Sequence, residues 1–383
     1  MNVRRSASAI NIDEFKTRSA PSPDRCVLNE EAFLRMVSLE RKRTERSGKP
    51  FLLMLLEAGN GLSSGKRERL LGSLVSALTL TTRETDVTGW YRDGSVFGVM
   101  FTELGMEDRN SIIGTVLQRV SATLRDQLTF EQFNEVSISF HLFPEDWDQD
   151  LERPSNPKLY PDLERRDNSR KFFCAVKRAM DIAGSAIAIA MLSPIFLAIA
   201  AAIKLTSKGP IFFRQQRIGQ HGVPFTFLKF RSMYVNNDAS KHKDYVLKLI
   251  AGTADRKPSE GNGNGVYKLT NDPRITPVGA WLRRTSLDEL PQFFNVLKGE
   301  MSLVGPRPPI TYEVEAYEIW HRRRMLEAKP GITGLWQVNG RSRVEFDEMV
   351  RLDLRYAKTW SPWMDVQILL RTPRAVVMGD GAY

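Results

Sequence analysis

Apolar and polar positions divide the chain into a mixed first part and a second part that opens with one long apolar stretch. Residues 51–56 are continuously apolar, which is typical of a buried strand, and residues 70–80 carry apolar side chains at helical spacing. Apolar segments on both sides of the turn residues 92–95 predict a β-hairpin, and residues 136–142 alternate as a further strand. This order of elements predicts a small α/β domain over residues 24–143.

Two polar regions flank this domain. Residues 1–23 are rich in Ser, Arg and Asp and have no apolar core, so they predict a disordered tail and not a signal peptide. Residues 144–170 contain several Pro, Asp and Arg residues and predict a linker. A second domain is then expected over residues 171–383.

Residues 182–203 contain no charged side chain. As a helix they would reach about 33 Å, enough to cross a bilayer, which favours a membrane helix over a buried core helix. Pro194 lies at the middle, where it removes a helical hydrogen bond and bends the helix, and the Ser193 hydroxyl could bind the freed carbonyl. Basic residues flank both ends, so we expect a re-entrant hairpin that enters and leaves on the cytoplasmic side. A kinked helix that spans the membrane is the alternative.

Composition restricts the partners and the compartment. The chain of 383 residues has 55 Lys and Arg against 45 Asp and Glu, a net charge of +10, which favours nucleic acid, acidic lipid or phosphorylated substrates as partners. Two cysteines and four scattered histidines form no disulfide framework and no histidine metal site. The low cysteine content fits the reducing cytoplasm.

A dense group of polar residues surrounds Asp288 and Glu289. The spacing of Ser286 and Glu289 matches a capping box, so a purely structural helix start is one interpretation. The other is catalytic: a carboxylate at a helix N-terminus near Arg283 should remain ionised, and such a group can attack phosphorus. Adjacent helical side chains point about 100° apart, so one carboxylate can attack while the other holds Mg²⁺, which prefers oxygen ligands and bridges diphosphate oxygens.

A diphosphate substrate also requires cations. Arg307 lies between Pro306 and Pro308, whose fixed backbone angles would hold its guanidinium rigidly. Lys229 and Arg231 lie among apolar residues and could neutralise further phosphate oxygens. A single basic residue is usually a solvated surface charge, so a phosphate site is indicated only by these basic residues together with the two carboxylates.

In this order, the features resemble the monotopic polyprenyl-phosphate phosphoglycosyl transferases, also called bacterial sugar transferases, from about Lys177 to the end of the chain. The resemblance begins with the apolar segment broken at Ser193-Pro194. It continues through five ordered motifs, which are residues 229–233, 285–292, 305–308 and 329–341, and Asp353 with Tyr356. Several ordered motifs are far more specific than any one of them.

The resemblance implies a two-step displacement. Asp288 would attack the β-phosphorus of a nucleotide diphosphate sugar, in this family a UDP-linked glucose or galactose, and release the nucleoside monophosphate. Polyprenyl phosphate, such as undecaprenyl phosphate, would then resolve the aspartyl-phosphosugar in a first membrane step of exopolysaccharide or other glycan synthesis. Asp288 and Glu289 would hold Mg²⁺, and the substrate-binding residues would be Lys229, Arg231, Arg283, Arg307, Arg341 and Asp353.

The implied architecture is an α/β N-terminal domain joined to a helix-rich monotopic catalytic domain on the cytoplasmic face of the bacterial inner membrane. Anionic membrane lipid is an expected partner, with Tyr317, Trp320 and residues 322–324 facing the headgroups. A solvated helix face is the alternative for the three arginines. Nucleic acid is not expected as a partner, and a homo-oligomer remains open.

The order of elements in the N-terminal domain resembles a GGDEF (diguanylate cyclase-like) domain. Ser95 and Val96 stand where that family carries acidic metal ligands, so the domain would be catalytically inactive. An unrelated α/β sensor domain is the alternative. For the whole chain, two rival functions are a membrane-tethered nucleotide-sensing signalling protein and a non-enzymatic assembly scaffold, although a scaffold gives no reason for Asp288 and Glu289 among so many cations.

Overall fold

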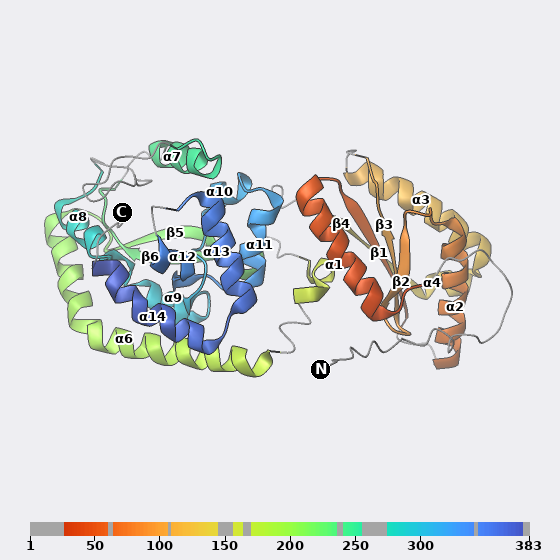
Figure 1. The fold of residues 1–383 in the computed structure, drawn as a ribbon, viewed down its shortest axis with the longest axis horizontal. Coiled ribbons are helices and arrows are strands. Elements are labelled where there is room, and N and C mark those ends of the chain that lie inside the picture. The colour runs from red at the N-terminus through yellow and green to blue at the C-terminus, as the bar shows by residue number, and fades with distance from the viewer. Residues whose placement is uncertain are drawn as a thin grey trace, which may run out of the picture.

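The computed structural model describes residues 27–59, 64–105, 109–144, 156–163, 170–235, 240–254, 274–340 and 344–377. Figure 1 shows two lobes side by side, the N-terminal domain in red to orange and the C-terminal domain in green to blue. The predicted tail, residues 1–23, lies outside the described residues, as do Arg341 and most of the predicted linker.

The N-terminal domain contains a four-stranded antiparallel sheet with the strand order β2-β3-β1-β4. Its strands are β1 (Phe51–Ala58), β2 (Val87–Arg92), β3 (Val96–Phe101) and β4 (Val136–Phe143). The strands and the hairpin predicted from the apolar pattern are therefore confirmed. The helices are α1 (Glu30–Ser47), α2 (Ser64–Thr81), α3 (Arg109–Gln127) and α4 (Phe130–Asn134).

β1 is apolar at nearly every position because helices cover both faces of the sheet. Leu52 and Met54 belong to a core with residues of α2 and α3, whereas Leu53 and Leu55 belong to a core with residues of α1. Successive side chains of a strand point to opposite faces, so a middle strand between two helical layers has no solvent-facing side.

The C-terminal domain opens with α6 (Lys171–Thr206), a helix of 36 residues that is long and apolar enough to cross a membrane. The predicted segment, residues 182–203, lies inside it. Only 11% of its most apolar window is buried within the protein, and large apolar side chains such as Ile187, Met191 and Leu197 are exposed. A core helix of a soluble domain would bury such side chains, so this exposure favours contact with lipid.

α6 is bent. Figure 1 shows it turning from one side of the C-terminal domain to the next. Pro194 lies inside the helix and has no N–H for the carbonyl of Ala190, and Ser193 Oγ donates to that carbonyl at 2.9 Å. The predicted role of Ser193 is thus confirmed, while the re-entrant course through a membrane stays a prediction.

The rest of the C-terminal domain packs inside the angle of α6 (Figure 1). Its described strands are the antiparallel hairpin β5 (Phe212–Ile218) and β6 (Pro224–Phe230) and the parallel pair β7 (Ser302–Val304) and β8 (Gly331–Thr333). The helices are α7 (Ser240–Ile250), α8 (Pro277–Arg284), α9 (Gln292–Lys298), α10 (Thr311–Glu315), α11 (Ile319–Glu327), α12 (Leu335–Asn339), α13 (Phe346–Thr359) and α14 (Pro362–Val377). The described residues also contain 3-10 turns, which are η1 (Pro157–Leu159) in the linker and η2 (Gln220–Gly222) and η3 (Leu287–Glu289) in the C-terminal domain.

A network of ion pairs connects the N-terminal domain to the linker and to the C-terminal domain. Arg323 of α11 lies 3.3 Å from a carboxylate oxygen of Glu45 in α1. Arg41, also in α1, is fully buried and binds both Glu45 and Asp162. Its two contacts with the carboxylate of Asp162 measure 3.0 and 2.9 Å. Buried charges require partners, so this network fixes the approach of α1 to α11.

α11 is an interior helix and not a surface one. Leu326 lies in the same apolar core as Leu159 and Tyr160, which belong to the described part of the predicted linker. Tyr317, which precedes α11, and Arg324 within it are 5% and 2% exposed, so the prediction that they face lipid headgroups is wrong. The prediction failed because a helix rich in basic and aromatic residues has the same sequence pattern whether it contacts lipid headgroups or packs against other protein segments.

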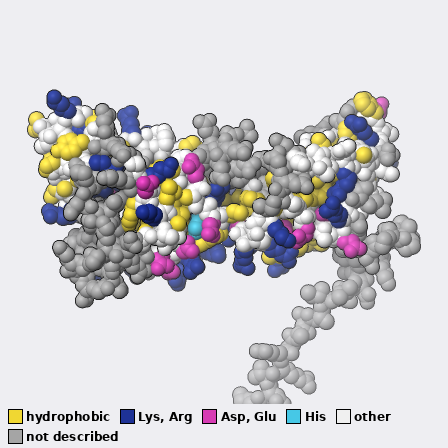
Figure 2. Space-filling model, turned by 90° about the horizontal axis from the view of Figure 1, so that it is seen from above, with side chains coloured by type: hydrophobic (Ala, Val, Ile, Leu, Met, Phe, Trp, Pro, Cys, Tyr) yellow, Lys and Arg dark blue, Asp and Glu magenta, His cyan; other side chains and the backbone are white. Residues whose placement is uncertain are grey.

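The positive charge is not concentrated on the face that Figure 2 shows. Lys and Arg side chains there are scattered among apolar and acidic ones over both domains. The part of this face that the structure describes therefore offers no single extended cationic groove.

Candidate active site

Two segments that are distant in the sequence place a cation between two carboxylates. Lys229 comes from β6, and Asp288 and Glu289 come from η3, which packs against β6. Lys229 Nζ donates a hydrogen bond to Glu289 Oε1 at 2.7 Å and lies 3.7 Å from Asp288 Oδ2. The structure thus brings three of the predicted site residues together.

The backbone breaks just before the carboxylate pair. Ser286 has a φ of 57°, in the left-handed region, and its side chain makes no capping hydrogen bond, so the capping-box interpretation is wrong. Asp288 instead lies in a single 3-10 turn, and Pro291 directly precedes α9. A non-glycine residue in this conformation costs about 1–3 kcal/mol and is typical of sites where function fixes the local geometry.

The two carboxylates differ in their electrostatic surroundings, although burial disfavours the charge on both. For Glu289, the charges of Lys229 and Arg307 outweigh burial and hold the pKa at about 2. For Asp288, which is 7% exposed, burial and the charge of Glu289 outweigh Lys229, so the pKa is raised above its ordinary value. Glu289 is therefore the firmly ionised member of the pair, and Asp288 is the one whose charge is poorly stabilised.

Arg217 of β5 is a residue of this site that the sequence did not single out. It is 4% exposed, its guanidinium donates to the carbonyl of Pro308 at 2.6 Å, and it lies 4.3 Å from the centre of the Phe227 ring. Burial lowers the pKa of Arg217 to about 10, so it remains charged at neutral pH and helps to depress the pKa of Glu289. From the sequence alone, an arginine in a short strand is expected to face solvent. Arg217 is buried only because distant segments of the chain pack around it.

The loop that carries Arg307 is held from behind by a buried ion pair. Arg324 Nη2 donates to the main-chain carbonyl of Arg307 at 2.9 Å and lies 2.8 Å from Asp353 Oδ2. Asp353 is 1% exposed, and burial raises its pKa to about 6 although Arg324 opposes the shift. The structure therefore places Asp353, a predicted substrate-binding residue, as the partner of Arg324 beneath this loop.

The remaining predicted binding residues have different positions. Arg231 is 5% exposed and donates through both Nη atoms to carbonyls at the C-terminal end of α6, so it is occupied in capping that helix. Arg283 lies in the last turn of α8, and its charge lowers the pKa of Asp288 as predicted, but burial outweighs it, so the pKa of this carboxyl is raised where the sequence predicted a group that stays ionised. Arg341 lies outside the described residues.

The donor set at this site fits Mg²⁺ only in combination with substrate. Among the described residues, no group of three or more His, Cys, Asp or Glu side chains could hold a metal ion. Asp288 and Glu289 supply two carboxylates, and Mg²⁺ is commonly bound through one or two carboxylates together with substrate phosphates and water. Binding of Mg²⁺ at this pair stays a prediction.

Residues 172–379 match the family model described as bacterial sugar transferase, which is more than half of the chain. The chain belongs to this family. The match covers Lys229, Asp288, Glu289 and Arg307, so the cluster described above lies wholly inside the bacterial sugar transferase region.

Similar curated proteins align with the same region. The galactosyl transferase CpsE of Streptococcus agalactiae is 44% identical over 54% of this chain and 43% of its own length. The undecaprenyl-phosphate galactose phosphotransferase of Salmonella typhimurium is 44% identical over 54% of this chain and 42% of its own length. The chain thus spans less than half the length of these two relatives. The exopolysaccharide production protein ExoY of Rhizobium meliloti is 39% identical over 54% of this chain and 88% of its own length.

Some solved structures resemble about a third of the chain. A DGC protein from Thermotoga maritima covers 32% of this chain and 85% of its own, with 21% identity and a TM-score of 0.26. A likeness of this size carries no conclusion, so the resemblance to a GGDEF domain stays a prediction.

Proposed function

We propose that this bacterial sugar transferase moves a sugar-1-phosphate from a UDP-sugar to undecaprenyl phosphate at the cytoplasmic face of the bacterial inner membrane. The names of its relatives support this reaction class. One of them, the UDP-glucose:undecaprenyl-phosphate glucose-1-phosphate transferase of Klebsiella pneumoniae, is 42% identical over 54% of this chain. The exposed apolar surface of α6 supports a membrane acceptor.

The observation that carries the proposal is the asymmetric pair of carboxylates. Asp288 is buried and poorly stabilised as an anion, while Glu289 beside it is ionised and bonded to Lys229. A desolvated carboxylate is a stronger nucleophile than a hydrated one. Adjacent cations then allow a diphosphate to approach without repulsion.

In the first proposed step, a carboxylate oxygen of Asp288 forms a bond to the β-phosphorus of the donor. The bond from that phosphorus to the bridging oxygen breaks, and the nucleoside monophosphate leaves with the electron pair. In the second step, a phosphate oxygen of the lipid acceptor attacks the same phosphorus, and Asp288 returns to a free carboxylate. Glu289 and Asp288 would hold Mg²⁺, which would supply charge neutralisation at the diphosphate.

Lys229 and Arg307 are proposed to neutralise the charge that develops on the phosphate oxygens. Lys229 already lies between the two carboxylates, and Arg307 is exposed on a loop that Arg324 holds in place. Fixed cations of this kind act without reorganisation at the moment of reaction. Arg217 supports the same loop through the carbonyl of Pro308.

The test is to trap the intermediate. Wild-type protein incubated with Mg²⁺ and a UDP-sugar labelled in the sugar, without lipid acceptor, should acquire covalent label, and Asp288→Asn should acquire none because an amide cannot form the acyl phosphate. Asp244→Asn, the same change at an exposed position of α7, is the matched control and should label like wild type. Label or turnover in a folded, membrane-bound Asp288→Asn close to that of wild type would falsify the nucleophile assignment.

The rival function of nucleotide signalling has less support at the N-terminal hairpin. Neither Ser95 nor Val96 has a carboxylate to bind a metal. Val96 is also buried, and Ser95 Oγ donates to the carbonyl of Arg92 at 3.4 Å. We expect the full chain to form no cyclic di-GMP from GTP and Mg²⁺, with an active diguanylate cyclase as positive control. Robust product would show that the alignment of this hairpin with the GGDEF signature is mistaken.

A further inference from the structure

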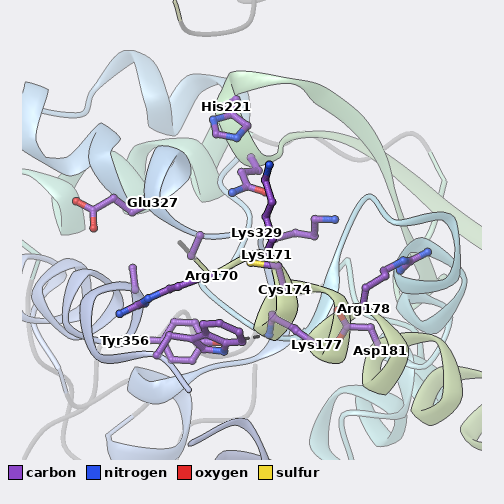
Figure 3. Close-up of a pocket in the computed structure, with 14 residues that line it drawn as sticks. Arg170, Lys171, Cys174, Lys177, Arg178, Asp181, His221, Glu327, Lys329 and Tyr356 are labelled. Carbon is purple, nitrogen blue, oxygen red and sulfur yellow. Dashed lines mark hydrogen bonds between the residues drawn. The ribbon is translucent and has the colours of Figure 1, made fainter. Parts of the chain in front are cut away.

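A cavity of about 440 Å³ lies apart from the carboxylate pair, where the first turns of α6 meet the turn between β5 and β6 and the segment between α11 and β8. None of Asp288, Glu289, Lys229 and Arg307 lines it. Figure 3 shows Lys171 and Lys329 near its centre, with His221 on one side and Tyr356 on the opposite side. The proposed reaction gives this cavity no role.

The lining of the cavity carries an excess of positive charge. Five cations line it, and only two carboxylates do. The cations are Arg170, Lys171, Lys177, Arg178 and Lys329, and the carboxylates are Asp181 and Glu327. Like charges gathered in a partly enclosed space repel one another, so the cavity favours an anionic occupant.

Both carboxylates of the lining are already engaged elsewhere. Asp181 Oδ1 accepts hydrogen bonds from Ser302 Oγ and from the Leu303 N–H, each at 2.9 Å. Glu327 accepts two hydrogen bonds from the guanidinium of Arg323, four residues before it in α11. Glu327 is thus compensated by Arg323, whereas Asp181, bonded to neutral donors, offsets only part of the positive charge of the lining.

Most of the cations, by contrast, have no carboxylate partner within the described ranges. Lys177 is paired with Asp365 at 2.6 Å, whereas Arg178 donates to the main-chain carbonyls of Val296 and Leu297, near the C-terminal end of α9. Arg170, Lys171 and Lys329 form no ion pair with any residue that the structure describes. Lys329 is half-buried, and burial together with the charges of Arg178 and Lys177 lowers its pKa although the charge of Asp181 opposes the shift.

We propose that this cavity binds the phosphate group of an anionic membrane phospholipid. The rim identifies the source of the phosphate. Phe172 and Phe173, 74% and 50% exposed, are interleaved in the first turn of α6 with the lining residues Lys171 and Cys174. Exposed aromatic rings beside cations at the end of a membrane helix are typical of the headgroup region, whereas a soluble phosphate has no use for them.

The site would hold the first turns of α6 at headgroup depth, at the end of the helix remote from the α6 C-terminus that Arg231 caps. The sequence predicted lipid contact around α11, and the structure buries two of those residues, Tyr317 and Arg324. The cavity indicates that the lipid contact lies at the N-terminal end of α6 instead. Because this inference concerns lipid binding and not transfer, it does not depend on the proposed reaction.

The full chain in a neutral detergent provides the test. Water-soluble dihexanoyl phosphatidylglycerol should raise the midpoint of thermal unfolding in a saturable way, whereas dihexanoyl phosphatidylcholine should not. Lys329→Gln should weaken the apparent affinity for the phosphatidylglycerol at least about tenfold, a loss typical of a charge-assisted contact. Lys204→Gln, at an exposed lysine near the other end of α6, is the matched control and should bind like wild type.

Lys171→Gln keeps the proposal testable if the half-buried Lys329 proves necessary for folding, because Lys171 is exposed and also lines the cavity. A titration with inorganic phosphate distinguishes a lipid headgroup from free phosphate as the source of the bound phosphate group. Stabilisation by inorganic phosphate as strong as by the lipid would overturn the lipid assignment. An unchanged affinity in both lysine variants, or no stabilisation by phosphatidylglycerol, would overturn the site itself.

Discussion

Lys229 is the charge that couples the two carboxylates, so its removal should change the pH dependence of the reaction. Its Nζ lies 2.7 Å from Glu289 Oε1 and 3.7 Å from Asp288 Oδ2, and its side chain is only 17% exposed. An opposite charge at such a distance lowers a carboxyl pKa by roughly 1–3 units, or about 1.4–4 kcal/mol. Lys229→Gln should therefore raise the pKa values of both carboxyl groups by about this amount.

The direction of the effect on rate follows from the role of Asp288. Attack requires the ionised carboxylate, so activity falls as the pH drops through the pKa of the free enzyme. In Lys229→Gln, the acidic limb of the kcat/KM profile should move to higher pH by about 1–3 units. Because the two carboxyl groups interact, the limb reports an apparent value for the pair.

The assay is release of nucleoside monophosphate from a UDP-sugar between pH 5 and 9, with undecaprenyl phosphate present. Lys229→Arg is the matched control, since it keeps the positive charge and should leave the acidic limb near its wild-type position. A Lys229→Gln profile that is uniformly lower but has the same acidic limb would refute the reasoning. Lys229 would then bind substrate without tuning Asp288.

Two further predictions concern the frame around the site. Arg323→Gln should destabilise the protein by about 3 kcal/mol in denaturant titrations, because a cation between buried carboxylates is lost. The double variant with Glu45→Gln should lose less stability than the sum of the two single variants. Strictly additive losses would show that the pair does not couple the domains. Single cysteines placed near Lys171 and Lys208 in a cysteine-free background should both resist a membrane-impermeant maleimide in intact cells. Labelling near Lys171 from outside would show that α6 spans the membrane, and Pro194→Leu should favour that outcome.

Several features followed from sequence alone because they depend on local periodicity or on one residue type. The continuous apolar run of β1 and the hairpin around residues 92–95 required only strand patterning. The exposed apolar surface of α6 and the hydrogen bond of Ser193 to the freed carbonyl followed from length, composition and the chemistry of Pro194. The ordered motifs from Lys229 to Tyr356, taken together, were sufficient to identify the family.

The partners of the charged residues were decided only by the tertiary structure. In the sequence, Lys229 and Arg231 are equivalent cations two positions apart, yet Lys229 binds Glu289 while Arg231 caps the end of α6. Arg324 looked like a surface charge, and the fold buries it beneath the loop of Arg307. The physical reason is that periodicity specifies which face of an element is apolar, whereas the partner of a long charged side chain depends on which distant segments pack beside it.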